Sequence, residues 1–309
     1  MAIPVLITSA IPASCEAALQ DGFIVHHLPA APERAAFFRD VGPTIRAIAG
    51  SRTDAATMAA LPNLEIIANF GVGYDGVDIA AAKARKIRVT NTPDVLNEAV
   101  AEIATGLMIA LSRRIVEADK FIRAGKWREG AFQLTSELNG RTLGIVGLGR
   151  IGKAIALRAQ AMRMRVVYYG RHRQPAEPYV YYDDVLAMAR DCDWLIAITP
   201  GGKGTEKLIS RQVLEALGPQ GNFVNMSRGT VVDQPALIEM LAARKLGGAA
   251  LDVFLDEPNV PEGLFDLDNV VLSPHMGSGT HETRIAMGEM MADNIKAHFA
   301  GEPLLSPVA

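Results

Sequence analysis

The sequence contains little cysteine and no strong excess of either charge. Only two of its 309 residues are cysteines, Cys15 and Cys192, and neither stands in a CxxC or Cys/His spacing. This pattern excludes a disulfide framework and a zinc site, so we expect no metal and a reducing, cytoplasmic location. The formal net charge of -3 provides no basic surface that would attract nucleic acid or an anionic membrane.

Long hydrophobic runs are also missing. No apolar run reaches the roughly 18 to 20 residues that a membrane span requires. The apolar start of the chain lacks the basic region that opens a signal peptide, and the alternation of Val5 and Ile7 with small residues favours a first β-strand. We therefore expect a soluble protein without a cleaved leader and without a membrane partner.

The residues that are present have an ordinary globular composition and a repeating order. Hydrophobic residues make up 49% of the chain, and its length exceeds what one hydrophobic core usually serves. Short β-branched runs alternate with helical stretches, which is typical of βαβ units and parallel sheets. The runs form two series: 3–8, 22–28, 45–50 and 64–70, then 141–149, 164–170, 193–199, 221–227, 247–254 and 269–275. We therefore predict an α/β protein with two doubly wound parallel-sheet domains.

Two longer helical segments predict how these domains are joined. In 98–111 apolar residues recur at helical spacing after the breaker at 91–94, so we expect this segment to cross into the second domain. No breaker interrupts 281–299, which predicts a long terminal helix. We expect that helix to pack on the first domain and to make it discontinuous.

A glycine-rich turn lies between an apolar strand and an amphipathic helix, with the sequence Gly147-Leu148-Gly149-Arg150-Ile151-Gly152. The first glycine permits a tight turn, the second lets the backbone approach a pyrophosphate, and the third lets helix and strand pack closely. The helix N-terminus offers unpaired N–H groups to the phosphates. A glycine-rich turn without a ligand is the alternative. We interpret the motif as a dinucleotide-binding turn and count Arg150 and Ile151 among its cofactor contacts.

The next strand of this series ends in Gly170, Arg171, His172 and Arg173. NAD-binding units usually place an acidic residue here for the ribose 2′-hydroxyl, and that acid is absent. Two guanidiniums instead favour a 2′-phosphate, with His172 as a further donor. A solvated basic loop is the alternative. We predict that NADP(H) is preferred and that NAD(H) is used at lower efficiency.

Three later segments each place a reactive side chain just after an apolar strand, where ligands gather in open α/β sheets. These side chains are Arg228, Glu257 and His275. Each one alone has an ordinary alternative: a surface charge, a solvated loop acid and a polar loop residue. Their order after a dinucleotide turn favours a shared catalytic role.

The segments 225–230, 251–258 and 272–279, together with 69–75, resemble the D-isomer-specific 2-hydroxyacid dehydrogenase family. The resemblance extends to the terminal helix and is weakest over roughly the first 60 residues. The segment 264–284 and the basic loop look most like the NADP-linked glyoxylate/hydroxypyruvate reductases and the similar hydroxyphenylpyruvate reductases. The resemblance implies NADPH-dependent reduction of a small 2-oxo acid to the D-2-hydroxy acid.

The resemblance also implies a role for each of the reactive residues. His275 would give a proton to the carbonyl oxygen, since an imidazole titrates near neutral pH. Glu257 would hydrogen-bond the other ring nitrogen and orient it. Arg228 would polarise the carbonyl and grip the substrate carboxylate in a fork that lysine does not reproduce. The backbone N–H groups of Val72 and Gly73 would bind the same carboxylate, and a simple strand-to-helix turn is the alternative there.

Further cofactor contacts follow from the resemblance alone. Asp252 would hold the nicotinamide carboxamide, and the remaining contacts would be Thr199, Pro200 and Gly277.

The domain organisation is implied in the same way. Residues 1–98 and 285–309 would form a flavodoxin-like substrate-binding domain, residues 99–284 a Rossmann cofactor domain, and the cleft between them the active site. Family members are typically dimers, for which 98–111 and the Trp127 loop are candidate contacts.

Two alternatives to this function remain open. The protein would be a hydroxyphenylpyruvate reductase or a broad-specificity 2-oxo acid reductase if its substrate pocket accepts larger side chains. A dinucleotide-sensing binding protein, like the corepressors that share this fold, would bind the cofactor without turning over a 2-oxo acid.

Overall fold

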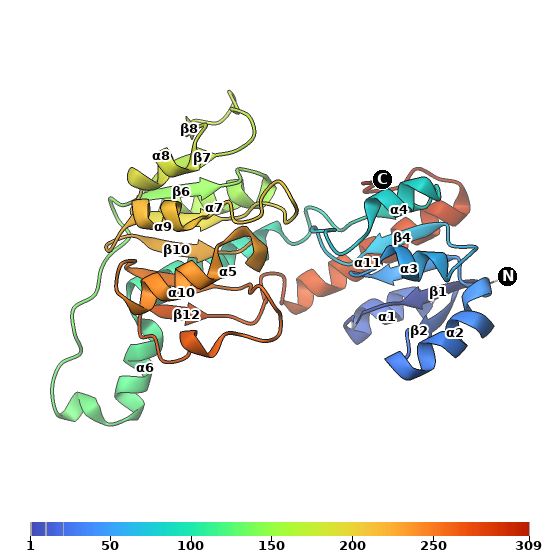
Figure 1. Cartoon of the computed structure of the whole chain (residues 1–309), viewed down its shortest axis with the longest axis horizontal. Helices are drawn as coiled ribbons and strands as arrows, with labels where there is room; N and C mark the ends of the chain where they lie inside the picture. The colour runs from blue at the N-terminus through green and yellow to red at the C-terminus, as the bar shows by residue number, and fades with distance from the viewer. Residues whose placement is uncertain (1, 10, 21, 309) are drawn as a thin grey trace. The chain divides into compact units, whose positions relative to one another are not determined.

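The structure, a computed structural model, describes residues 2–9, 11–20 and 22–308, which form two compact units. Unit 1 comprises Met1–Leu96 and Ser278–Ala309, and unit 2 comprises Asn97–Gly277. The boundaries expected from the sequence fall inside helices α5 (Asn97–Ser112) and α11 (His281–Ala300), whereas the units separate just before each helix begins. Each helix therefore belongs as a whole to one unit (Figure 1).

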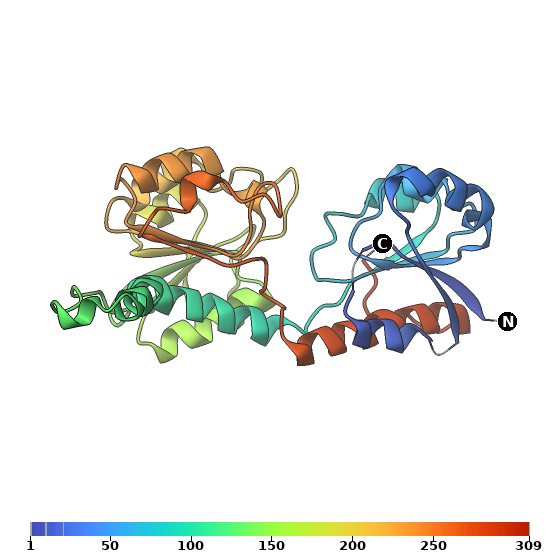
Figure 2. The ribbon, with the colours of Figure 1, turned by 90° about the horizontal axis from the view of Figure 1, so that it is seen from below.

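Unit 1 contains a five-stranded parallel sheet with the strand order β2-β1-β3-β4-β5, which is the flavodoxin-like order. Helices α1 and α11 cover one face, and α2, α3 and α4 lie on the other (Figure 2). The strands are β1 (Ile3–Ile7), β2 (Phe23–His27), β3 (Ala47–Gly50), β4 (Ile66–Asn69) and β5 (Arg88–Thr90). The helices are α1 (Ala13–Gln20), α2 (Arg34–Asp40), α3 (Ala55–Ala59), α4 (Ile79–Ala84) and α11, with short 3-10 turns at Ala31–Glu33 and Gly42–Thr44.

The terminal helix α11 forms as the uninterrupted sequence predicts. Its first turn is capped by the Thr280 side chain, which accepts a hydrogen bond from the Thr283 N–H, and it ends at Gly301 in a left-handed conformation. It packs against α1 and β4 of unit 1. Beyond it the chain returns to β5, where Val308 donates a hydrogen bond to the Val89 carbonyl. The carboxyl end of β5 is therefore supported by the last residues of the chain, which also form an isolated bridge between Thr90 and Pro307.

Unit 2 contains a seven-stranded parallel sheet with the order β12-β11-β10-β9-β6-β7-β8, which is the Rossmann order extended by one strand. Helices α5 and α7 pack together on one face, and α8, α9 and α10 lie on the other (Figure 2). The strands are β6 (Thr142–Val146), β7 (Arg165–Tyr169), β8 (Val180–Tyr182), β9 (Trp194–Ala197), β10 (Asn222–Asn225), β11 (Gly248–Leu251) and β12 (Val270–Leu272). The helices are α5, α6 (Ile115–Arg123), α7 (Arg150–Ala161), α8 (Val185–Arg190), α9 (Arg211–Leu217) and α10 (Gln234–Ala242), with 3-10 turns at Lys126–Arg128, Gly229–Val231 and Glu262–Leu264.

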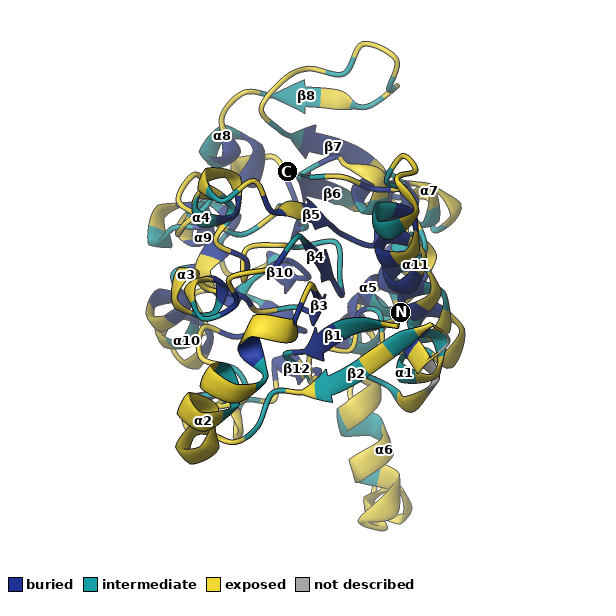
Figure 3. Ribbon diagram, turned by 90° about the vertical axis from the view of Figure 1, so that its right-hand side faces the viewer, coloured by how far each residue is buried: buried dark blue, intermediate teal, exposed yellow. Residues whose placement is uncertain are grey.

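The central strands of both sheets are buried, because helices cover both of their faces. All four residues of β3, β4, β9 and β11 are buried, whereas the edge strand β2 is partly exposed (Figure 3). This explains why their sequences are continuous apolar runs without polar alternation. The predicted fold class, two doubly wound parallel-sheet domains, is confirmed.

One helix departs from this layered arrangement. Helix α6 has no buried residue and extends with the following loop away from the sheet of unit 2 (Figure 1). Among the described residues, no helix combines the length and the apolar character needed to cross a membrane.

Candidate active site

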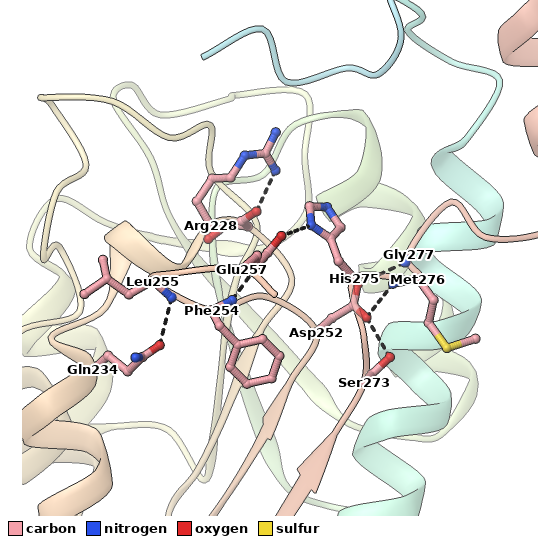
Figure 4. A network of polar contacts seen from close by, with 11 residues as sticks. Arg228, Gln234, Asp252, Phe254, Leu255, Glu257, Ser273, His275, Met276 and Gly277 are labelled. Atoms are coloured by element: carbon pink, nitrogen blue, oxygen red, sulfur yellow. Dashed lines mark hydrogen bonds and ion pairs between the residues drawn. The ribbon is translucent and has the colours of Figure 1, made fainter. Parts of the chain in front are cut away.

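Three neighbouring strands of unit 2 bring the predicted catalytic residues to one edge of the sheet. Strands β10, β11 and β12 pair in parallel, so their carboxyl ends lie side by side. Arg228 follows β10, Glu257 follows β11 and His275 follows β12. Figure 4 shows the three side chains together in the loops at this edge. Residues separated by almost 50 positions are therefore gathered by strand order alone.

His275 and Glu257 form a direct pair. The Nδ1 atom of His275 lies 2.7 Å from Oε2 of Glu257, and the other carboxylate oxygen of Glu257 accepts a hydrogen bond of 3.0 Å from the Phe254 N–H (Figure 4). The carboxylate is thus held in place while it orients the imidazole. With Nδ1 engaged by the carboxylate, Nε2 is the ring nitrogen that is left to exchange a proton with a ligand. The His275 side chain is half exposed, which leaves it accessible.

The backbone of His275 is in the left-handed region, with φ at +50°, and Asp252 holds the loop there. The buried Asp252 carboxylate accepts hydrogen bonds from the Ser273 hydroxyl at 2.6 Å and from the N–H groups of Met276 and Gly277, each at 2.9 Å. The Asp252 carbonyl accepts the His275 N–H at 2.8 Å. These contacts stabilise a backbone conformation that a non-glycine residue rarely adopts.

Asp252 therefore has a structural task that its sequence context did not reveal. Its carboxylate accepts three hydrogen bonds from the chain itself, and an ionised carboxylate has about four acceptor positions. A contact with the nicotinamide carboxamide stays a prediction.

Arg228 stands in a loop shaped by a buried asparagine. Asn225, the last residue of β10, accepts hydrogen bonds from the Ser227 N–H at 3.1 Å and from the Ser227 hydroxyl at 2.9 Å. Its amide nitrogen donates to the Arg228 carbonyl at 3.1 Å. The guanidinium of Arg228 donates to the Ser227 carbonyl at 2.7 Å (Figure 4). The loop is thereby closed on itself and presents the guanidinium from a fixed backbone.

Three residues of this network were missed at the level of the sequence: Asn225, Gln234 and Ser273. Gln234 is buried and its side-chain oxygen accepts a hydrogen bond of 2.9 Å from the Leu255 N–H, which fixes the loop that carries Glu257. The sequence did contain a signal for Asn225, which is a polar residue at the end of an apolar strand. Buried polar groups are nearly always hydrogen-bonded, so such a residue indicates a partner nearby.

The glycine-rich turn has the geometry that a dinucleotide requires. Gly147 has φ at +106°, which favours glycine, and a β-carbon there would come within 3.0 Å of the Thr199 methyl group. A β-carbon on Gly152 would overlap the Gly147 carbonyl oxygen. Gly149 faces open space, so backbone is exposed there to an approaching ligand. Thr199 has a buried hydroxyl oxygen without a hydrogen-bond partner among the described residues, which leaves a donor for a bound group.

Helix α7 begins directly at this turn without a capping side chain. Within the described residues, the N–H groups of Ile151 and Gly152 have no acceptor. Unpaired N–H groups at a helix N-terminus attract anions, and the helix dipole adds to the effect. The residues present therefore fit a pyrophosphate.

The basic loop is tied to the same turn. Gln174 donates a hydrogen bond of 2.7 Å from its side chain to the Leu148 carbonyl, and its N–H donates at 2.7 Å to the Tyr168 hydroxyl. Arg171 and Arg173 are exposed, and neither forms an ion pair within the described residues. Residues 170–173, which directly follow β7, include no acidic side chain.

In unit 1 the predicted carboxylate-binding residues Val72 and Gly73 lie in a turn directly after β4, at the carboxyl edge of that sheet. Both residues are half-buried.

Pro200, predicted to contact the cofactor, is exposed in unit 2 just after Thr199.

Comparison with known families and proteins places these features in context. Residues 105–277 match the model of the D-isomer specific 2-hydroxyacid dehydrogenase, NAD binding domain. The chain is 48% identical over 280 residues to a glyoxylate/hydroxypyruvate reductase A of Arabidopsis thaliana, covering 90% of each chain. It is 48% identical over 268 residues to a hydroxyphenylpyruvate reductase of Plectranthus scutellarioides, covering 86% of each.

A solved structure agrees over the whole chain. The NADPH-dependent glyoxylate/hydroxypyruvate reductase of Sinorhizobium meliloti, crystallised with NADP and malonate, superposes with a TM-score of 0.93 at 41% identity and covers 100% of this chain and 97% of its own. These matches point to the same family as the two parallel sheets and the residues of the candidate site. The chain therefore belongs to the D-isomer-specific 2-hydroxyacid dehydrogenase family of oxidoreductases.

Proposed function

We propose that this protein is an NADPH-preferring reductase that converts a small 2-oxo acid, glyoxylate or hydroxypyruvate, to its 2-hydroxy acid, with the D configuration where the product is chiral. The observation that carries the proposal is the contact of 2.7 Å between His275 and Glu257, formed beside Arg228 in a unit that also holds a dinucleotide-binding turn. The Arabidopsis relative and the Sinorhizobium structure bear the names of glyoxylate/hydroxypyruvate reductases, which supports the substrate class.

The cofactor proposal follows from two charged features of unit 2. The N-terminus of α7 would hold the pyrophosphate, and Arg171 and Arg173 would pair with a 2′-phosphate. The Sinorhizobium relative is named as NADPH-dependent and was crystallised with NADP, which supports this choice. When bound, the reduced nicotinamide supplies the hydride that the reaction needs.

Reduction of a carbonyl leaves negative charge on its oxygen, and His275 is suited to neutralise it. We infer that Nε2 of His275 donates a proton to that oxygen, because Nδ1 is occupied by Glu257. The Glu257 carboxylate stabilises the protonated imidazole before the transfer and holds its orientation. In the reverse direction the same nitrogen accepts the proton of the hydroxyl group.

The substrate carboxylate needs positive partners, and two are available. Arg228 would bind it with a planar fork of N–H donors and would polarise the adjacent carbonyl. The N–H groups of Val72 and Gly73 in unit 1 would bind the same group. Both contacts recognise what every 2-oxo acid shares, so they leave the side chain of the substrate to be selected elsewhere.

Reduction of hydroxyphenylpyruvate is the second candidate function. The Plectranthus relative with this name is as similar in identity as the Arabidopsis reductase, at 48%. The catalytic residues would be the same for both substrates. The difference would be in the pocket that accepts the substrate side chain.

We also propose a homodimer in which a second copy of the chain covers the segment 115–137. Helix α6 has no buried residue, and Ile122, Trp127 and Leu134 are 55%, 67% and 98% exposed. Several large apolar side chains exposed within one segment favour burial against a partner. Helix α5, the other segment expected at the contact, has most of its apolar side chains buried, with Ile103 and Ile109 partly exposed. Light scattering of Trp127→Glu and Leu134→Glu variants, which should be monomeric, tests this arrangement.

A cytoplasmic location stays a prediction from the cysteine content. Both cysteines are buried thiols outside any disulfide. Fractionation of cells that express the tagged protein tests the location directly.

A substrate panel tests the proposed activity. The purified protein is assayed with NADPH and NADH on glyoxylate, hydroxypyruvate, hydroxyphenylpyruvate and 2-ketogluconate, and the configuration of the chiral products is determined. We expect the highest kcat/KM with NADPH and glyoxylate or hydroxypyruvate, and D-products. Higher kcat/KM with hydroxyphenylpyruvate would establish the second candidate, and a preference for NADH would contradict the cofactor choice.

A further inference from the structure

Residues 71–73 form a turn that follows β4 in unit 1. The carbonyl groups of all three residues accept hydrogen bonds from buried side chains. The amide nitrogen of Asn69 donates to the carbonyls of Gly71 and Gly73, each at 3.0 Å. The amide nitrogen of Asn91 donates to the carbonyl of Val72 at 2.9 Å. Asn69 is the last residue of β4 and Asn91 directly follows β5, and these two strands are neighbours in the sheet. Two side-chain amides thus hold three successive backbone carbonyls.

These contacts determine where the N–H groups of the turn point. In a planar trans peptide the carbonyl of one residue and the N–H of the next point in opposite directions. Because the carbonyls of Gly71 and Val72 are drawn toward the asparagines, the N–H groups of Val72 and Gly73 are directed away from them. Neither N–H has an acceptor among the described residues, whereas the Gly71 N–H donates to the Thr92 hydroxyl at 3.1 Å. Successive unpaired N–H groups form an anion-binding surface.

The asparagine at position 69 carries an energetic cost in the folded state. Asn69 is fully buried, and its side-chain oxygen has no hydrogen-bond partner within the described part of the chain. A buried polar atom without a partner destabilises the folded state. The amide nitrogen nevertheless donates two hydrogen bonds to the same turn. We therefore infer that the role of Asn69 is to fix the conformation of this turn.

Asn91 is itself held in place by the end of the chain. The Ser306 hydroxyl donates to the Asn91 carbonyl at 2.6 Å, and the Asn91 N–H donates to the Ser306 carbonyl at 3.3 Å. Asn294 of α11 donates to the Ser306 hydroxyl at 3.0 Å. All three residues are buried. The position of the Asn91 amide is therefore set by a network that extends into the terminal helix.

We propose that Asn69 and Asn91 are positioning residues, whose amides hold the turn 71–73 so that its free N–H groups bind the carboxylate of the substrate. The inference rests on the proposed function, in which Val72 and Gly73 receive that carboxylate. Neither asparagine touches the substrate. Their effect is to keep two donors aligned before the substrate arrives, which saves the cost of ordering the turn during binding.

A matched control is present in unit 2. The amide nitrogen of Asn269 also donates to two carbonyls, those of Leu241 at 3.4 Å and Gly247 at 3.2 Å, and its side-chain oxygen is likewise buried without a partner in the described residues. Asn269 directly precedes β12, whereas His275 follows that strand. Asn269→Ala therefore removes the same kind of contact at the opposite edge of the sheet from the catalytic residues.

The experiment compares Asn69→Ala, Asn69→Asp and Asn91→Ala with Asn269→Ala in the full-length protein. We expect the Asn69 and Asn91 variants to raise KM for the 2-oxo acid by roughly 10- to 100-fold, because the donors are misplaced, while KM for the cofactor is unchanged. Asn69→Asp keeps the size of the side chain and loses its donors, so it keeps the test valid if the alanine variant does not fold. Asn269→Ala should lower Tm and leave the KM for the 2-oxo acid within twofold.

A substrate without the carboxylate separates positioning from general damage. For the methyl ester of the same 2-oxo acid, Asn69→Ala should leave kcat/KM unchanged relative to wild type, whereas kcat/KM for the free acid falls. An equal loss for acid and ester, or a KM for the acid within twofold of wild type, would overturn the inference.

Binding without turnover separates this inference from the proposed function. Malonate is titrated calorimetrically into wild type and the Asn69 variants in the presence of NADP. Weaker malonate binding by the variants supports the inference even if the wild type reduces no 2-oxo acid, in which case only the proposed function fails. Equal affinity for malonate in wild type and variants overturns the inference.

Discussion

The backbone of Gly229 lies directly against the backbone of Phe254. A β-carbon added to Gly229 would overlap the carbonyl carbon of Phe254 and the nitrogen of Leu255. The loop that carries Arg228 and the loop that carries Glu257 are therefore in contact at a point where no side chain fits. Glycine at this position sets the spacing of two proposed catalytic residues.

Gly229→Ala should push these loops apart and lower kcat/KM for the 2-oxo acid by roughly 10- to 100-fold, because a displacement of about 1 Å misaligns the catalytic groups. Steady-state kinetics and thermal unfolding measure the two effects. Gly106→Ala is the control, since Gly106 is exposed on α5 with open space around it and should gain about 0.5 to 1 kcal/mol in stability with unchanged activity. Normal kcat/KM in Gly229→Ala would show that the spacing is unimportant.

His275→Ala should lower kcat by roughly 10²- to 10⁴-fold, the usual contribution of a general acid. Glu257→Gln should also lower kcat, since the neutral amide no longer stabilises a protonated imidazole. Because the two side chains are in contact at 2.7 Å, the double variant should lose much less than the sum of both effects in free energy. Additive losses in this double-mutant cycle, or near-normal kcat in His275→Ala, would contradict the assignment.

Arg228→Lys should raise KM for the 2-oxo acid and lower kcat, because an ammonium group does not reproduce the planar fork. We expect kcat/KM to fall by roughly 100-fold, which corresponds to about 2.7 kcal/mol. Arg211→Lys is the matched control, since Arg211 pairs with Glu239 on the surface and should retain full activity. Little change in KM and kcat for Arg228→Lys would exclude bidentate binding of the substrate carboxylate by Arg228.

The double substitution of Arg171 and Arg173 by serine should reduce kcat/KM with NADPH and leave kcat/KM with NADH nearly unchanged. Each charge-assisted hydrogen bond contributes roughly 1.5 to 3 kcal/mol, so the loss with NADPH should be at least about tenfold. Arg190→Ser on α8 serves as the control for removing a positive charge. An equal loss with both cofactors would indicate that the loop does not distinguish them.

Asp268 should contribute to stability only above acid pH. The guanidiniums of Arg244 and Arg114 hold the pKa of this carboxyl below its ordinary value. A carboxyl with a lowered folded-state pKa stabilises the fold above its unfolded pKa, about 3.9, and this contribution is lost as pH falls through the folded-state pKa. Asp268→Asn should therefore have a lower Tm than wild type at pH 7, and the difference should decrease progressively as the pH falls below about 4.

The neighbouring exposed Asp266 provides the comparison for this pH series. Asp266→Asn should match wild type throughout, since the described residues give Asp266 no ion pair. A Tm difference for Asp268→Asn that stays constant from pH 7 to pH 3 would argue against a charge effect.

Local patterns in the sequence were sufficient for the fold class, although the three-residue edge strands β5 and β8 lie outside the predicted runs. Apolar runs of strand length, the glycine-rich turn and the uninterrupted terminal segment all depend on neighbours along the chain, so they could be interpreted without coordinates. The unit boundaries were placed less accurately, because the start of a helix such as α5 depends on where its packing begins and not only on its apolar spacing. The pairing of His275 with Glu257 followed from the family resemblance rather than from the residues themselves.

What the amino-acid order determined is therefore most of the strands, apart from β5 and β8, together with the glycine-rich turn and the set of candidate catalytic side chains. What only the tertiary structure decided is how those side chains are held: by Asp252 on the His275 loop, and by Asn69 and Asn91 on the turn after β4. Most of these hydrogen bonds join residues at the ends of neighbouring strands. The exceptions are those of Asn69, whose partners Gly71 and Gly73 are close to it in the sequence. Their geometry depends on strand order and backbone direction, which no local pattern specifies.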